Sequence, residues 1–167
     1  MTEFKDNMVV ICDVDGCLTN GGFYSTKDGK YLKKFGADDW DCIKELQKYM
    51  KVQFITADKK GFEIVRKRLE DEMGFDLDIV THTPKERWDW IVSKFPDFMI
   101  IVIGDGVYDW YSLQNCDYGI TTVAALKHVK ECADFVIYRD SGDRFVAEAC
   151  LKILEKYCDV DIKSIGL

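Results

Sequence analysis

The sequence has 167 residues, of which 47% are apolar and 32% charged, a composition typical of one globular domain with a real core. Its formal net charge is −7 and its isoelectric point is near 4.9. This balance excludes the basic stripe that binding to a nucleic-acid backbone requires, so we expect no nucleic-acid partner. A small phosphorylated substrate held by one or two local cations remains compatible with the charge.

Cysteine usage predicts a reducing compartment. The count is odd and no C-x-x-C pair occurs, which favours free thiols over a disulfide framework or a zinc site. The cysteines are Cys12, Cys17, Cys42, Cys116, Cys132, Cys150 and Cys158. The first six residues lack the apolar core of a signal peptide, and no apolar run is long enough to span a bilayer. We therefore expect a cytoplasmic protein without a membrane partner.

Taken in chain order, apolar runs alternate with helical patterns. The first predicted strand covers the apolar run at residues 8–12, and a hairpin with strands at 23–26 and 31–35 follows, because Asp28-Gly29 is a turn signal. Further strands are predicted at 52–55, 77–80, 98–103, 118–121 and 134–137, and helices at about 38–50, 60–73, 84–95, up to 115, 123–131 and 143–157. This alternation predicts an α/β fold with a mostly parallel sheet, as one domain over residues 1–167.

Two carboxylates follow the first strand. Asp13 and Asp15 share one side of an extended chain, just past the strand end where ligands bind in open parallel sheets, and Gly16 permits a sharp turn. Neighbouring carboxylates repel unless a positive charge lies between them, which favours a hard divalent cation such as Mg²⁺. The alternative is an ordinary strand followed by an acidic turn.

Polar residues also follow three later strands. Thr56 follows the second parallel strand, Lys85 begins the helix after the third, and Asp105 and Asp109 follow the fourth. Each has an alternative interpretation: a helix cap for Thr56, a solvated charge for Lys85, and a cap and an exposed acid for the two aspartates. Together, however, they supply the carboxylates, hydroxyl and ammonium that a phosphoryl-transfer site needs.

This order of motifs resembles the haloacid dehalogenase (HAD) superfamily of phosphohydrolases. The signature is D-x-D-G, then Thr, then Lys, then G-D-x-x-x-D, which here spans Asp13 to Asp109. Residues 13–21 and 35–43 further resemble the small sugar-acid phosphatases that act on 3-deoxy-D-manno-octulosonate 8-phosphate (KDO 8-phosphate) and related compounds. The resemblance implies a three-layer α/β sandwich with parallel-strand order 5-4-1-2-3.

The resemblance also implies catalytic roles. Asp13 would attack phosphorus and form an aspartyl-phosphate, and Asp15 would protonate the leaving oxygen and then activate water. Thr56 and Lys85 would hold the transferring phosphoryl group. Phosphomonoester hydrolysis of a small sugar or sugar-acid phosphate is the activity that follows.

The same resemblance implies a Mg²⁺ site. Asp13, the backbone carbonyl of Asp15, and Asp105 would hold the cation. Asp109 would support the metal site or orient Lys85. These assignments come from the family signature, and they agree with the acidic clustering described above.

The chain has no insertion large enough for a cap domain. In capless relatives the hairpin after the first strand builds a tetramer, and here that hairpin carries Phe23, Tyr24, Tyr31 and Phe35. An apolar surface of this kind is unusual on a soluble monomer, so we expect a homotetramer.

Several substrate-facing positions depart from the family pattern. Ala57 and Asp58 stand where relatives often carry Gly-Arg, Gly106 stands where they carry an acid, and Ala147 stands where they carry Arg. An aspartate in place of an arginine predicts a poorer fit for a substrate carboxylate, unless Arg144, Lys59 or Lys60 supplies the cation.

Two other functions remain open at the level of sequence. A catalytically silent domain that only assembles oligomers is one, since some relatives have lost the nucleophilic aspartate. The other is a nucleotide phosphatase. The presence of both Asp13 and Asp15 favours an enzyme over the silent domain.

Overall fold

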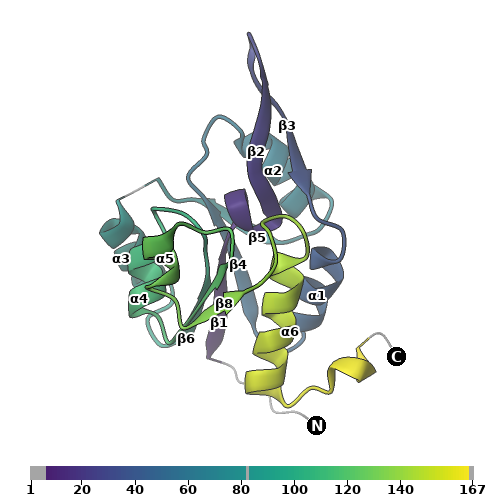
Figure 1. Ribbon diagram of the computed structural model, residues 1–167, viewed down its shortest axis with the longest axis vertical. Helices are drawn as coiled ribbons and strands as arrows, with labels where there is room; N and C mark the ends of the chain where they lie inside the picture. Colours follow the sequence, from purple (N-terminus) through teal and green to yellow (C-terminus); the bar gives the residue numbers. More distant parts are fainter. Residues whose placement is uncertain (1–6, 82, 166–167) are drawn as a thin grey trace.

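The computed structural model describes residues 7–81 and 83–165, and its centre is a six-stranded sheet in which every pairing is parallel (Figure 1). The strand order is β5-β4-β1-β6-β7-β8. The strands are β1 (Met8–Asp13), β4 (Lys51–Thr56), β5 (Asp76–Ile79), β6 (Met99–Ile103), β7 (Tyr118–Thr122) and β8 (Phe135–Ile137). From β1 the chain adds β4 and β5 on one side of the sheet, and it then crosses over to add β6 on the other side of β1. The strand order therefore reverses between β1 and β6, and open α/β sheets bind ligands at the carboxyl ends of the strands at such a reversal.

Helices cover both faces of the sheet. One face is covered by α1 (Asp39–Leu46), α2 (Phe62–Arg66), the π-helical turn η2 (Lys67–Asp71) and α6 (Phe145–Cys158). The other is covered by α3 (Pro84–Lys94), α4 (Trp110–Asn115) and α5 (Lys127–Lys130), and a 3₁₀ turn, η3 (Ile162–Ser164), follows α6. Figure 1 shows the two helical layers on opposite sides of the strands.

The sequence of β1 explains its central place. Val10 and Cys12 pack into the core on the α1–α6 side, and Val9 and Ile11 pack into the core on the α3–α5 side. Side chains of a strand alternate between faces, so a strand covered on both sides must be apolar throughout. The first polar side chain, Asp13, therefore marks the point where β1 leaves the core.

A two-stranded hairpin projects beyond the sheet (Figure 1). Its strands are β2 (Thr19–Thr26) and β3 (Gly29–Phe35), and it is joined to β1 by the turn η1 (Val14–Leu18). Phe23, Tyr24, Tyr31 and Leu32 are 50–70% exposed on it. Phe35, predicted to be exposed, instead packs against the α1–α6 core. The predicted apolar hairpin surface is thus present, with Leu32 in place of Phe35.

The predicted fold class is confirmed. The five strands expected from the family resemblance have the predicted order, and β8 extends the sheet at one edge. The predicted helices at 38–50 and 123–131 are shorter than expected, because turns occupy their ends. Within the described residues no cap domain stands over the sheet, and no helix is long and apolar enough to cross a membrane.

Candidate active site

The carboxyl ends of β1, β4 and β6 open into a cleft of about 340 Å³. It is lined by Asp13, Asp15, Lys30, Ala57, Asp58, Arg87, Gly106, Val107, Tyr108 and Asp109. Gly16 turns the chain beneath it with φ of 98°, and a side chain there would collide with the carboxylate of Asp105. Glycine thus lets the β1 turn approach the β6 turn closely, which brings their carboxylates into one site.

A buried arginine lies against the first carboxylate. Arg87 of α3 is 1% exposed, and its Nη1 donates to Asp13 Oδ1 at 3.2 Å and also to Asp109 Oδ1. Its Nη2 donates to the carbonyl of Val80 at 3.4 Å. A charge this deeply buried is stable only when paired, and here two carboxylates pair with one guanidinium.

Asp109 organises the turn that follows β6. Its Oδ2 accepts the backbone N–H groups of Asp105 at 3.1 Å and Gly106 at 2.9 Å, while its Oδ1 accepts from Arg87. A side chain at Gly104 would lie 2.6 Å from Asp109 Cβ, so this turn requires glycine there. Asp109 thus contacts both the turn after β6 and Arg87, whereas the sequence predicted Lys85 as the cation beside it.

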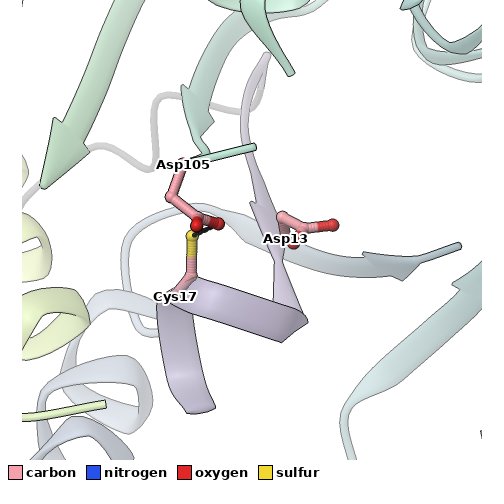
Figure 2. Close-up of side chains that lie close together, drawn as sticks. All are labelled: Asp13, Cys17 and Asp105. Carbon is pink, nitrogen blue, oxygen red and sulfur yellow. Dashed lines mark hydrogen bonds between the residues drawn. The ribbon is translucent and has the colours of Figure 1, made fainter. Parts of the chain in front are cut away.

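Asp13, Cys17 and Asp105 form a compact group of potential ligands (Figure 2). One ligand atom from each lies within 4.8 Å of the others, and Cys17 Sγ donates to Asp105 Oδ1 at 3.6 Å. Burial, and next the charge of Asp109, raises the pKa of Asp105 to about 7, and the same two causes raise the pKa of Asp13. The carboxylates thus face uncompensated negative charge, and a divalent cation fits that donor set.

The thiol in this group was not expected from the sequence. Burial, and next the hydrogen bond with Cys12, raises the pKa of Cys17 well above its ordinary value. The thiol is therefore protonated and acts as a donor to Asp105. Two carboxylates beside a neutral thiol suit a hard cation such as Mg²⁺ better than a soft one, because hard cations prefer oxygen ligands.

Asp15 and Thr56 meet on the other side of the cleft. Thr56 Oγ1 donates to Asp15 Oδ2 at 3.1 Å, and Thr19 Oγ1 donates to Asp15 Oδ1 at 3.4 Å. Lys33 Nζ donates to both oxygens of Asp15, at 2.7 and 2.9 Å. The structure thus brings together Asp13, Asp15, Thr56, Asp105 and Asp109, as the predicted site requires.

Asp58 has two lysine partners from the hairpin. Its Oδ2 lies 2.6 Å from Lys30 Nζ and 2.8 Å from Lys33 Nζ. Burial alone would raise the pKa of Asp58, but the hydrogen bonds from these lysines outweigh it and lower the pKa to about 2. Asp58 is therefore not the unpaired repulsive charge on which the expected poor fit of a substrate carboxylate depended.

Two residues named in the sequence comparison, Arg144 and Ala147, lie away from the cleft. Arg144, weighed above as a substitute cation, is bound to Asp38. Ala147 is buried in the core, and its backbone N–H donates to Asp39 Oδ1 at 2.8 Å. Neither residue lines the cleft.

Lys85 is the predicted site residue that the structure does not bring to the cleft. Its side chain is 66% exposed and pairs with Asp89, one helical turn further along α3, at 2.7 Å. The helix begins at Pro84 with a Thr83–Glu86 capping box, which sets its phase so that Lys85 faces solvent. Arg87, two residues later, lies on the buried face with Ile91, and this i, i+4 relation was the signal available in the sequence.

Similar proteins were found by sequence and by fold. No protein-family model matches the chain. The KDO 8-phosphate phosphatase KdsC of Salmonella typhi is 26% identical over 160 residues, which covers 90% of this chain and 80% of that protein. A HAD superfamily (subfamily III A) hydrolase from Legionella pneumophila is 25% identical, with a TM-score of 0.78 over 89% of this chain and 82% of that one. The chain resembles the HAD phosphatases.

Two further HAD-like structures share the fold. A KDO 8-phosphate phosphatase structure from Vibrio cholerae has a TM-score of 0.81 at 23% identity, over 95% of this chain and 89% of that one. The KDO 8-phosphate phosphatase of Moraxella catarrhalis, solved with magnesium, phosphate and KDO, has a TM-score of 0.76 at 21% identity, over 89% and 86% of the two chains. The comparisons confirm the predicted resemblance and the HAD-like fold, and they support a phosphatase as the activity.

Proposed function

We propose that the protein is a Mg²⁺-dependent phosphomonoesterase that hydrolyses a small phosphorylated sugar or sugar acid. The observation that carries this proposal is the placement of Asp13, whose carboxylate lies in the cleft between Arg87 and the carboxylate of Asp105. A nucleophile in this position is flanked by a cation on one side and by potential metal ligands on the other. The resemblance to KDO 8-phosphate phosphatases supports the substrate class.

The reaction follows from these positions. An oxygen of Asp13 attacks phosphorus, the bond from phosphorus to the substrate oxygen breaks, and an aspartyl-phosphate forms. Asp15 gives its proton to the departing oxygen, which leaves as an alcohol. Asp15 then takes a proton from water, which attacks phosphorus and releases inorganic phosphate and free Asp13.

In this proposal two side chains, Arg87 and Thr56, bind the phosphoryl oxygens. Arg87 replaces Lys85 in this proposed role, because the guanidinium already touches Asp13 whereas the Lys85 ammonium lies in solvent. The hydroxyl of Thr56, at the end of β4, is the second donor on the site. A guanidinium carries several N–H donors, so Arg87 can donate to a phosphoryl oxygen while Nη1 stays bound to the two carboxylates.

Asp13, Asp105 and the backbone carbonyl of Asp15 would hold the Mg²⁺. The cation supplies charge neutralisation between the attacking carboxylate and the anionic phosphoryl group. The magnesium bound in the Moraxella catarrhalis structure supports the choice of a divalent cation. Burial and the charge of Asp109 disfavour the ionised forms of Asp13 and Asp105 and so raise their pKa values. A bound cation would stabilise the ionised forms.

We also propose a cytoplasmic homotetramer assembled through the β2–β3 hairpin. Phe23, Tyr24, Tyr31 and Leu32 form an apolar surface that a second copy would cover. None of the seven cysteines forms a disulfide, and all of them lie in the described residues, which supports a reducing compartment.

A substrate panel tests the function. The panel contains sugar phosphates, sugar-acid phosphates and nucleotides, each assayed for phosphate release with Mg²⁺ and with excess EDTA. We expect turnover of a sugar or sugar-acid phosphate that EDTA abolishes and added Mg²⁺ restores. Turnover of nucleotides alone would replace the substrate class, and no turnover of any member would support a silent domain.

A further inference from the structure

The hairpin contributes a lysine to the interior of the site. Lys33 lies on β3, outside the parallel sheet, yet its side chain is only 1% exposed. Its Nζ lies 2.7 and 2.9 Å from the two oxygens of Asp15 and 2.8 Å from Asp58 Oδ2. One ammonium is therefore shared between the proposed acid–base residue and a second carboxylate.

The surroundings hold this lysine in one place. Gly61 lies beside the pair, and a side chain there would collide with Asp58 and approach Lys33 Cε to 2.8 Å. The Gly61 N–H donates to Asp58 Oδ1 at 3.0 Å, and Lys30 binds Asp58 Oδ2 from the rim. Asp58 is thus fixed on both oxygens, and it fixes Lys33 in turn.

We propose that Lys33 is a positioning residue for Asp15 and that Asp58 is its anchor. This inference rests on the proposed phosphatase function. An ammonium bound to both oxygens fixes the rotation of the Asp15 carboxylate, whose other hydrogen-bond partners among residues 7–81 and 83–165 are the Thr56 and Thr19 hydroxyls. General acid catalysis requires the donor oxygen to lie within hydrogen-bond reach of the leaving group, so orientation controls its efficiency.

Asp58 gives the arrangement a second property. A buried ammonium left without a carboxylate would be strongly destabilising, and Lys33 has two carboxylate partners, Asp15 and Asp58. The contact with Asp58 therefore holds the ammonium in place beside Asp15. The hairpin is therefore part of the active site of its own subunit as well as a proposed contact surface.

The test uses Lys33→Met, with Lys34→Met as a matched control from the exposed next position of β3. For each protein, kcat/KM is measured with Mg²⁺ on the sugar phosphate that the panel identifies and on p-nitrophenyl phosphate. An alkyl leaving group needs a proton from Asp15, whereas p-nitrophenolate hardly needs one. We expect Lys33→Met to lose about 10²-fold on the sugar phosphate, much less on p-nitrophenyl phosphate, and Lys34→Met to match the wild type.

Two further variants separate positioning from folding. Lys33→Met combined with Asp58→Asn removes one charge of each sign, so it keeps the local charge balance, and it should show the same leaving-group selectivity as Lys33→Met. Lys33→Met combined with Asp15→Asn should be no slower than Asp15→Asn alone, because Lys33 acts through Asp15.

Equal losses on the two substrates, or a full additional loss in the Asp15→Asn background, would show that Lys33 is only structural. Wild-type activity in Lys33→Met would also overturn the inference while leaving the proposed function intact. If the wild type and Lys34→Met release no phosphate from any phosphomonoester, the proposed function fails, and this inference fails with it.

Discussion

The acids of the site and the cations of the site come from different kinds of structure. Asp13 is the last residue of β1 and Asp105 lies just past the end of β6, whereas Arg87 comes from the interior of α3 and Lys33 from the hairpin. A strand end fixes where a side chain lies as soon as the sheet order is known. A helix or hairpin does so only once its phase and packing are known, which is why the acids were predictable and the cations were not.

The largest expected effect comes from removing the proposed nucleophile, and it tests the role of the acidic residues. We expect Asp13→Asn to lose more than about 10⁴-fold in turnover, since an amide is a poor nucleophile and a poor cation ligand. Phosphate release and circular dichroism are the measurements, and the fold should survive. Turnover near the wild-type rate would remove the basis of the mechanism.

The role of the cationic residues is tested by comparing variants of Arg87 and Lys85. Without Mg²⁺, Arg87→Met leaves Asp13 and Asp109 buried without their partner and should lower the free energy of unfolding by about 3–5 kcal/mol. Lys85→Met removes only an exposed pair with Asp89 and should change the free energy of unfolding far less. Urea unfolding measures both.

Activity should separate the same two variants. Arg87→Lys keeps the charge but loses the paired N–H groups, so it should fold and yet bind phosphate more weakly. Lys85→Met should keep wild-type kcat/KM. A large loss in Lys85→Met with an unaffected Arg87→Lys would restore the prediction made from the sequence motif.

The raised pKa of Asp105 provides a test of the proposed metal site. In the absence of a cation, a carboxyl whose pKa is raised from 3.8 to about 7 destabilises the fold progressively as pH rises through that interval. Mg²⁺ requires the ionised form, so its affinity should be about tenfold lower at pH 6 than at pH 8.

The increase in Tm on adding Mg²⁺ measures this dependence, and it should be larger at pH 8. The Asp105→Asn variant, which does not titrate, is the control and should lose most of the difference between the two pH values. An equal Mg²⁺-induced shift at both pH values in the wild type would contradict the assignment of Asp105 as a ligand.

The smallest expected effect concerns the tip of the hairpin. Replacing Tyr24 and Tyr31 together by Ser should reduce the proposed tetramer to smaller species in light scattering at micromolar concentration. Because these side chains are 70% and 65% exposed, the free energy of unfolding of each subunit should change little. A wild-type monomer with full activity would exclude the tetramer.

Much of the fold was predictable because its signals are local. The apolar run of β1 and the alternation of strands and helices gave the parallel sheet, and the family resemblance gave its order. The predicted helices were too long at their ends, where turn formation depends on tertiary contacts. Cys17 was not expected at the site, because only the close approach of the β1 and β6 turns brings its thiol to Asp105.

The cationic residues show most clearly what could not be predicted from the sequence. Lys85 fits the order of the family signature, but the capping box of α3 turns it toward solvent. Arg87 lies on the same helix face as the buried Ile91, and that pairing of a charge with an apolar position could have been read from the sequence. Lys33 carries no such signal, because its burial depends on how the hairpin folds over Asp15 and Asp58.

The central claim is that Asp13 becomes phosphorylated during turnover. The direct measurement is to quench the enzyme with acid during turnover, reduce it with borohydride and map its peptides by mass spectrometry, because reduction converts an aspartyl-phosphate to homoserine. We expect homoserine at Asp13 in the wild type with substrate, and none in its absence. Steady hydrolysis with no modification of the Asp13 peptide, or with the modification at another acid, would contradict the account.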